Sequence, residues 1–108
     1  MNNAIHFKET TFPNYHLIQF ELQDDVIPPI ALATLAPPDF IKNNFAHKGV
    51  VLSGRGPIWL YGFLIHHYHP TKWVATFDPR LQGAVIVASH DPEMQVGSVI
   101  PIQPEIFS

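Results

Sequence analysis

The segment that most constrains the fold is an apolar strand that leads through a glycine-rich turn into an apolar helix. Residues 50–52 (Val-Val-Leu) predict a buried strand, and the sequence Ser-Gly-Arg-Gly at residues 53–56 predicts a turn directly after it. An apolar helix over residues 57–68 opens with a proline, which is tolerated in a first helical turn. A second strand at residues 73–77 follows the helix. This order predicts a right-handed crossover between two parallel strands.

The flanking segments predict a mixed α/β domain around this crossover. The link that follows residues 73–77 is short, so the next strand should return antiparallel to it. Residues 26–48 contain two Pro-Pro pairs and stay ambiguous, because they are compatible with one or two short helices, at residues 30–35 and 38–44. The other expected strands are residues 4–8 and 15–22, which form an N-terminal β-hairpin, residues 84–89, and a last strand near residues 98–102.

Composition and charge exclude several classes of protein. The chain has 108 residues, so we expect a single domain over residues 1–108. It has no cysteine, which excludes a disulfide framework and a thiolate metal site. The net charge of −3, with six Lys and Arg in all, argues against a protein that coats DNA or RNA, so phosphate recognition must be local. We find neither a membrane-spanning stretch nor a signal peptide, and we expect a cytoplasmic protein.

Two groups suited to phosphate meet at one edge of the predicted sheet. The Ser53–Gly56 turn leaves the carboxyl end of the first parallel strand, and Asp78 and Arg80 leave the carboxyl end of the second. Carboxyl ends of parallel strands share one edge, which is where open α/β sheets bind ligands. The glycines let the backbone approach a ligand closely, and Arg55 adds a planar guanidinium suited to phosphate. The predicted ligand-binding residues are therefore Ser53, Gly54, Arg55 and Gly56.

Three histidines gather at the opposite edge of the predicted sheet. The helix runs back from the turn for about 18 Å, which places His66 and His69 at its far end, three residues apart on one face. The antiparallel strand at residues 84–89 carries His90 toward them. Such a cluster fits a metal-binding or catalytic role. Strand length separates this edge from the phosphate edge by roughly 20 Å.

Each of these features also has a purely structural explanation, which the sequence leaves open. The two glycines could serve only a tight turn, and Asp78 and Arg80 could belong to an ordinary hairpin turn. The two arginines could be solvated surface charges. Histidines at the end of a helix also interact favourably with the helix dipole without any ligand.

Several of these runs resemble a known family. The run at residues 53–59 (Ser-Gly-Arg-Gly-Pro-Ile-Trp) and the run at residues 78–81 (Asp-Pro-Arg-Leu) closely resemble the small CRISPR-associated proteins of the Csx-three family, which accompany type III CRISPR systems. His69 and His90 lie in similar runs, and the resemblance extends from residue 49 to about residue 102. It implies half of a Rossmann-like fold, distantly related to the domains that sense cyclic oligoadenylates.

The resemblance also implies an activity. The family's implied activity is that of a ring nuclease, a manganese-dependent phosphodiesterase that cleaves cyclic tetra-adenylate and so switches off this antiviral second messenger. Two alternatives stay open: a manganese-dependent exonuclease that removes adenylates from RNA 3′ ends, and a sensor that binds cyclic oligoadenylate without cleaving it. The implied catalytic residues are His69, Asp78 and Arg80. The implied metal is manganese or another divalent cation, and the resemblance associates His90 with it. The spacing along the helix suggests His66 as a second metal ligand.

Two further expectations concern assembly and the loop after Arg80. A homo-oligomer, as a dimer or a tetramer, would place two Ser53–Gly56 turns together and so bind a symmetric polyanion without a broad basic surface. Ligand-bridged stacks of such oligomers are compatible with this scheme. Gln82 is one residue more than the similar family run contains, so it should alter the shape of this loop.

Overall fold

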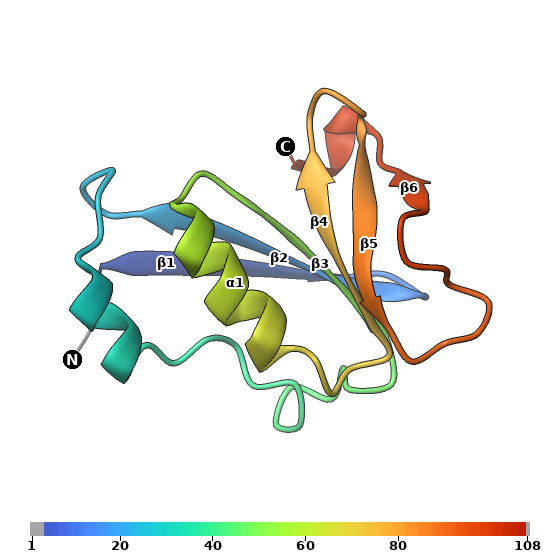
Figure 1. Cartoon of the computed structure of the whole chain (residues 1–108), viewed down its shortest axis with the longest axis horizontal. Helices are drawn as coiled ribbons and strands as arrows, with labels where there is room; N and C mark the ends of the chain where they lie inside the picture. The colour runs from blue at the N-terminus through green and yellow to red at the C-terminus, as the bar shows by residue number, and fades with distance from the viewer. Residues whose placement is uncertain (1–3, 108) are drawn as a thin grey trace.

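The computed structural model describes residues 4–107 and consists of one six-stranded sheet with a single α-helix (Figure 1). The strands lie in the sheet in the order in which they occur in the chain. Two short 3₁₀ turns, η1 (Pro29–Thr34) and η2 (Pro104–Phe107), complete the structure. The strands are β1 (Ile5–Thr11), β2 (Tyr15–Leu22), β3 (Gly49–Gly54), β4 (Trp73–Asp78), β5 (Gly83–Ser89) and β6 (Val99–Pro101), and the helix is α1 (Ile58–His67).

The centre of the sheet is parallel, and both of its sides are antiparallel. β3 and β4 pair in parallel on either side of the α1 crossover, as the sequence predicted, and β5 returns antiparallel to β4. β1 and β2 form the predicted N-terminal hairpin. The parallel pairing of β2 with β3 was not predicted. It adds a third strand whose carboxyl end lies at the edge of the sheet where the Ser53–Gly56 turn begins.

Each face of the sheet has its own hydrophobic core. Alternate residues of β2 supply both cores: Ile18 and Phe20 face α1, whereas Leu17 faces the opposite side. On the α1 side, Leu60 and Leu64 are fully buried against the sheet. The opposite core is closed by the C-terminal segment, including Ile102 and Phe107.

The segment between β2 and β3 is largely irregular. Of the two short helices with which its sequence is compatible, the first forms as η1, while residues 40–44 of the second form turns. The carboxylate of Asp39 accepts the backbone N–H groups of Ile41 and Lys42, which favours a turn over a continuous helix. Phe45 anchors the segment, because its ring is buried and stacks on His16 at 3.9 Å between ring centroids.

Within residues 4–107, no helix has both the length and the apolar character that crossing a membrane requires. α1 spans 10 residues, about half of what a bilayer needs.

Candidate functional site

The turn at the end of β3 is held in place from the helix that follows it. The hydroxyl of Tyr61, on α1, accepts the N–H of Gly54 at 3.0 Å and donates to the carbonyl of Gly54 at 2.6 Å. Burial raises the pKa of this hydroxyl, so it stays protonated and can do both at neutral pH. The sequence pattern identified Tyr61 only as part of an apolar helix and missed this role. Tyr61 therefore fixes the backbone from which the Ser53–Gly56 turn projects.

We expect Tyr61→Phe to loosen the turn while the fold is retained. The substitution removes both hydrogen bonds and little volume, so the free energy of unfolding should fall by about 1–2 kcal/mol. Hydrogen exchange at the Gly54 amide should become faster, and the increase should exceed the one that the loss of global stability alone would cause. Tyr15→Phe is the matched control, because the Tyr15 hydroxyl makes no hydrogen bond among residues 4–107. Unchanged exchange at Gly54 in Tyr61→Phe would contradict the role assigned to Tyr61.

Packing explains why the turn contains two glycines. A Cβ atom on Gly54 would lie 2.4 Å from the carbonyl oxygen of Phe20, on the neighbouring strand β2. A Cβ atom on Gly56 would lie 3.0 Å from the Leu60 side chain. Neither glycine has a positive φ angle. The close approach of β2 therefore accounts for Gly54 through packing, and neither glycine is required by its backbone angles. Ligand binding by Gly54 and Gly56 stays a prediction.

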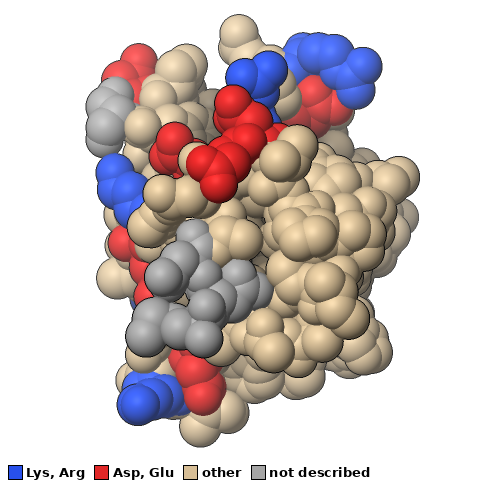
Figure 2. All heavy atoms as spheres, turned by 90° about the vertical axis from the view of Figure 1, so that its left-hand side faces the viewer, with Lys and Arg blue, Asp and Glu red and all other residues tan. Residues whose placement is uncertain are grey.

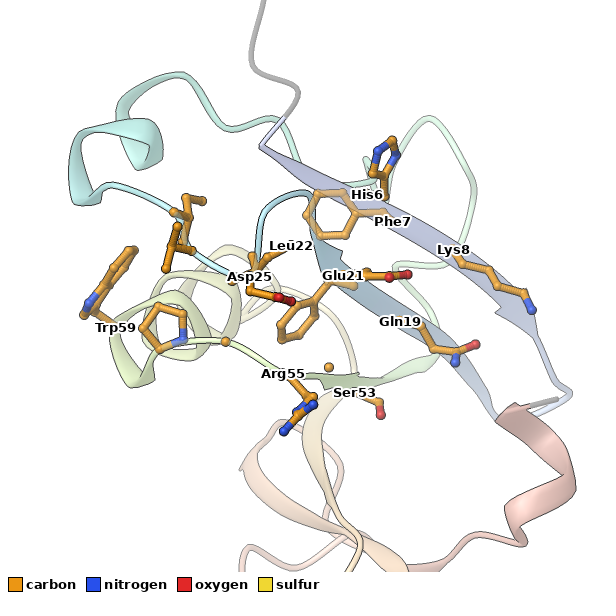
Figure 3. Close-up of a pocket in the computed structure, with 16 residues that line it drawn as sticks. His6, Phe7, Lys8, Gln19, Glu21, Leu22, Asp25, Ser53, Arg55 and Trp59 are labelled. Carbon is orange, nitrogen blue, oxygen red and sulfur yellow. The ribbon is translucent and has the colours of Figure 1, made fainter.

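An open hollow lies beside the turn, at the carboxyl ends of β2 and β3 (Figure 3). It has a volume of about 1000 Å³. Lys8, Gln19 and Ser53 are neighbours in one row across β1, β2 and β3, and Arg55 follows at the mouth of the turn. Trp59 lines the other end of the hollow. Lys8 and Gln19 were not predicted, because their proximity to Ser53 depends on the unforeseen parallel pairing of β2 with β3.

Arg55 is exposed and makes no ion pair with any residue in the described range 4–107. Its guanidinium is therefore available to an anion at the turn. A planar guanidinium can donate two parallel hydrogen bonds to a phosphate.

Asp78 and Arg80 lie at the same edge of the sheet as the turn, as predicted. β3 and β4 are parallel with Leu52 opposite Thr76, so both strands end on this side. Both oxygens of Asp78 accept hydrogen bonds from Arg80: the arginine Nε donates to Oδ1 at 3.2 Å and an Nη donates to Oδ2 at 3.1 Å. These hydrogen bonds lower the pKa of Asp78 and raise the pKa of Arg80, so both are charged at neutral pH. Asp78 thus orients an arginine whose side chain is 87% exposed.

The same residues also form the hairpin turn between β4 and β5. The backbone N–H of Leu81 donates to the carbonyl of Asp78, and that of Gln82 donates to the carbonyl of Pro79. Gln82 has a φ angle of 50°, in the left-handed region that non-glycine residues adopt at a cost. Its carbonyl accepts the N–H of Ile102, which ties the turn to the C-terminal segment. Gln82 thus ends this turn in a left-handed conformation, and its effect relative to the family's loop stays a prediction.

At the opposite edge, two of the three predicted histidines meet. β5 carries His90 to the end of α1, where its Nε2 lies 3.0 Å from the carbonyl oxygen of His69 and 3.4 Å from the Nδ1 of His69. His66 is exposed, and its side chain makes no hydrogen bond with the part of the chain that the structure describes. The next residue, His67, is packed against Phe40 and Tyr68, and burial lowers its pKa, so it is a neutral part of the core.

Residues 4–107 of one chain do not form a complete metal site. Among residues 4–107, no three His, Asp or Glu side chains are grouped closely enough to hold an ion. The pair His69 and His90 offers fewer ligands than the three or four protein groups of a typical transition-metal site, and His90 already faces a carbonyl oxygen. These residues alone do not fit manganese, so we derive no chemical step through a metal, and a manganese site at His66 and His90 stays a prediction.

The two edges are far apart in a single molecule. β4 leads from the histidine edge to Asp78, and Ser89 of the returning strand pairs with Trp73 at the start of β4. By strand rise, Asp78 and Arg80 lie roughly 20 Å from His69 and His90. One chain therefore brings together a turn with two arginines at one edge and two imidazoles at the other, and does not join the two groups.

These features define a small α/β protein with a strand–turn–helix site suited to phosphate and a separate pair of imidazoles. The chain belongs to a family of CRISPR-associated proteins: the family described as CRISPR-associated protein (Cas_csx3) matches residues 20–101. The matched range includes all predicted site residues, from Ser53 to His90, and confirms the family resemblance. An uncharacterized protein of Aquifex aeolicus (strain VF5) is 62% identical to this chain over 84 residues, which cover 78% of this chain and 75% of that protein.

Proposed function

We propose that this CRISPR-associated protein is a ring nuclease that binds and cleaves cyclic tetra-adenylate and so switches off type III antiviral signalling. The observation that carries the proposal is that the Ser53–Gly56 turn, which lines an open hollow, and the Asp78–Arg80 pair lie at the same edge of the sheet. Two exposed arginines offer local phosphate recognition in a chain whose net charge is −3. A small, polyanionic ligand fits that arrangement better than a long nucleic acid does.

In the proposed reaction, Ser53 and Arg55 bind one phosphate, and Arg80 stabilises the charge that develops on the phosphodiester that is cleaved. Asp78 holds Arg80 in position through its two hydrogen bonds. The hydroxyl of a water molecule or of the ribose 2′ position attacks phosphorus, and the bond from phosphorus to the 5′-oxygen breaks. Imidazole is the group in this set that exchanges a proton most readily near neutral pH, so His69 removes the proton of the attacking hydroxyl or supplies one to the leaving 5′-oxygen.

Since the two edges of one molecule lie roughly 20 Å apart, His69 must come from a second molecule. A homo-oligomer in which His69 of one copy faces Asp78 and Arg80 of another, with the nucleotide between them, would complete the site. Such a head-to-tail contact is heterologous and can propagate into stacks when the ligand bridges it.

The direct test is incubation of the protein with cyclic tetra-adenylate, with and without manganese, followed by analysis of the products. Linear di- or tetra-adenylate products support a ring nuclease. Shortening of a linear oligoadenylate from its 3′ end, without opening of the ring, would instead support the exonuclease. Tight binding without any product would support a sensor.

We expect Arg55→Ala to weaken binding of cyclic tetra-adenylate by about 10- to 100-fold, because a charge-assisted hydrogen bond contributes about 1.5–3 kcal/mol. Arg55→Lys should recover only part of the affinity, since an ammonium group cannot make the bidentate contact. Lys42→Ala is the matched control: it removes an exposed cation from the turns at residues 38–44. Titration calorimetry at a fixed salt concentration measures the affinity of all three variants for cyclic tetra-adenylate. An Arg55→Ala variant with wild-type affinity would exclude this residue from the site.

A further inference from the structure

The side chain of Gln19, on β2, has an unsatisfied hydrogen-bond acceptor beside the hollow. Gln19 lines the hollow, and its Oε1 is buried but accepts no hydrogen bond from any residue in the range 4–107. Buried polar atoms are nearly always hydrogen-bonded, and leaving one without a partner is unfavourable. The other two atoms of this kind belong to His16 and His67, which do not line the hollow. Gln19 therefore carries the buried acceptor that a ligand in the hollow could satisfy.

Gln19 lies one strand away from the turn that is suited to phosphate. β2 and β3 are parallel with Gln19 opposite Ser53, so their Cα atoms are separated by the strand spacing of about 4.8 Å. Gln19 follows Leu17 by two residues, so it lies on the face of the sheet away from α1, and Ser53 lies beside it (Figure 3). The hollow, at about 1000 Å³, has room for a nucleotide. A nucleotide whose phosphate binds at the turn can therefore place its base beside Gln19.

The charges around the hollow indicate which part of a ligand lies at Gln19. Exposed cations lie at the two ends of the row, Arg55 at the turn and Lys8 on β1, and the uncharged Gln19 lies between them. Glu21 and Asp25 also line the hollow. Figure 2 views the molecule from the side toward which β2 runs in Figure 1, and Asp and Glu side chains gather in the upper part of that face. Because carboxylates repel phosphate and accept hydrogen bonds, the group at Gln19 should be uncharged and should carry hydrogen-bond donors.

We propose that Gln19 recognises the adenine base of a nucleotide whose phosphate binds at the Ser53–Gly56 turn. Its Oε1 accepts a hydrogen bond from the 6-amino group, and its Nε2 donates one to the adjacent ring nitrogen, which is the bidentate pair that glutamine makes with adenine. Guanine presents two acceptors on the corresponding edge and would leave Oε1 without a partner. The choice of adenine over cytosine, which also carries an amino group, rests on the proposed function.

The affinities for two mononucleotides test this assignment, and NMR titrations followed at the backbone amides of Ser53 and Arg55 measure them. Adenosine 5′-monophosphate carries the 6-amino group, and purine riboside 5′-monophosphate differs from it only in lacking that group. The wild-type protein should bind the first about 5- to 150-fold more tightly than the second. Gln19→Leu has a similar volume and no polar atom in the side chain, so it should bind both with equal affinity.

Two further variants separate base recognition from other effects. Gln23→Leu is the matched control, because Gln23 directly follows β2 but does not line the hollow, and this variant should keep the wild-type preference. Arg55→Ala should weaken the binding of both mononucleotides by the same factor, since it removes a contact to the phosphate that they share. Each preference compares two ligands on one variant, so it does not depend on how much of that variant is folded.

Three results would overturn the proposal: a wild-type protein without preference between the two mononucleotides, a preference that survives in Gln19→Leu, or tighter binding of guanosine 5′-monophosphate than of adenosine 5′-monophosphate. None of these measurements uses ring opening, so their outcomes separate from those of the proposed function. A protein that prefers adenosine 5′-monophosphate but leaves cyclic tetra-adenylate intact refutes the ring nuclease alone. A protein that opens the ring but binds both mononucleotides equally refutes the base recognition alone.

Discussion

Mixing two inactive variants, His69→Ala and Asp78→Ala, is expected to restore cleavage of cyclic tetra-adenylate that neither variant shows alone. Loss of a proton-transfer group or of the group that orients Arg80 should each reduce the rate by about 100-fold or more. The topology separates the two residues by roughly 20 Å within one chain, so an active contact needs His69 from one molecule and Asp78 from another. At equal mixing, about one contact in four pairs an intact His69 with an intact Asp78 in such a head-to-tail arrangement.

The expected result is therefore roughly a quarter of the wild-type rate in the mixture, measured from the initial rate of ring opening at a fixed total protein concentration. The wild-type rate should also rise more than linearly with protein concentration. Circular dichroism and ligand binding of each variant provide the control for folding. If both variants are folded and bind the ligand but the mixture remains inactive, the catalytic groups act within one chain and the two-molecule site is wrong.

The local part of the fold could be predicted because neighbouring segments specify it. The strand, turn, helix and strand from residue 49 to 78 have the expected order and direction, since the apolar periods and Pro57 define each boundary. The short link after β4 correctly predicted an antiparallel β5. These two results were sufficient to predict that His69 and His90 meet, and that Asp78 and the Ser53–Gly56 turn share one edge.

The parallel pairing of β2 with β3 could not be predicted, because the segment that joins them is long and mostly irregular. No periodicity in residues 23–48 indicates where β3 returns, and the segment is held by distant contacts such as the stacking of Phe45 on His16. The row of Lys8, Gln19 and Ser53 in the hollow depends on that pairing. Long-range contacts of this kind leave no local pattern in a single sequence.

Within the site, the sequence indicated which positions matter more reliably than it indicated why those residues are there. Gly54 was predicted as a ligand-binding glycine, yet the carbonyl of Phe20 alone requires it. Tyr61 was counted among apolar residues of the helix, yet its hydroxyl holds the turn.

Gly54→Ala should destabilise the fold by about 3 kcal/mol or more, because the carbonyl of Phe20 leaves no room for a side chain at this position. The new methyl group would lie 2.4 Å from a backbone oxygen and 2.6 Å from the ring of Phe20, so β2 and β3 must separate where they pair. Gly56→Ala is the control in the same turn. Its methyl group meets the flexible end of Leu60 at 3.0 Å, and we expect a loss below about 1 kcal/mol.

Urea unfolding of both variants measures the difference, and the midpoint for Gly54→Ala should fall much further than that for Gly56→Ala. Because β3 carries the turn directly, the shift in Gly54→Ala should also displace Ser53 and Arg55 and weaken binding of cyclic tetra-adenylate. Binding measured below the unfolding midpoint separates this displacement from simple loss of folded protein. Equal stability of the two alanine variants would show that β2 moves away from the new methyl group at little cost. The pairing of β2 with β3 would then not hold the turn rigidly in place.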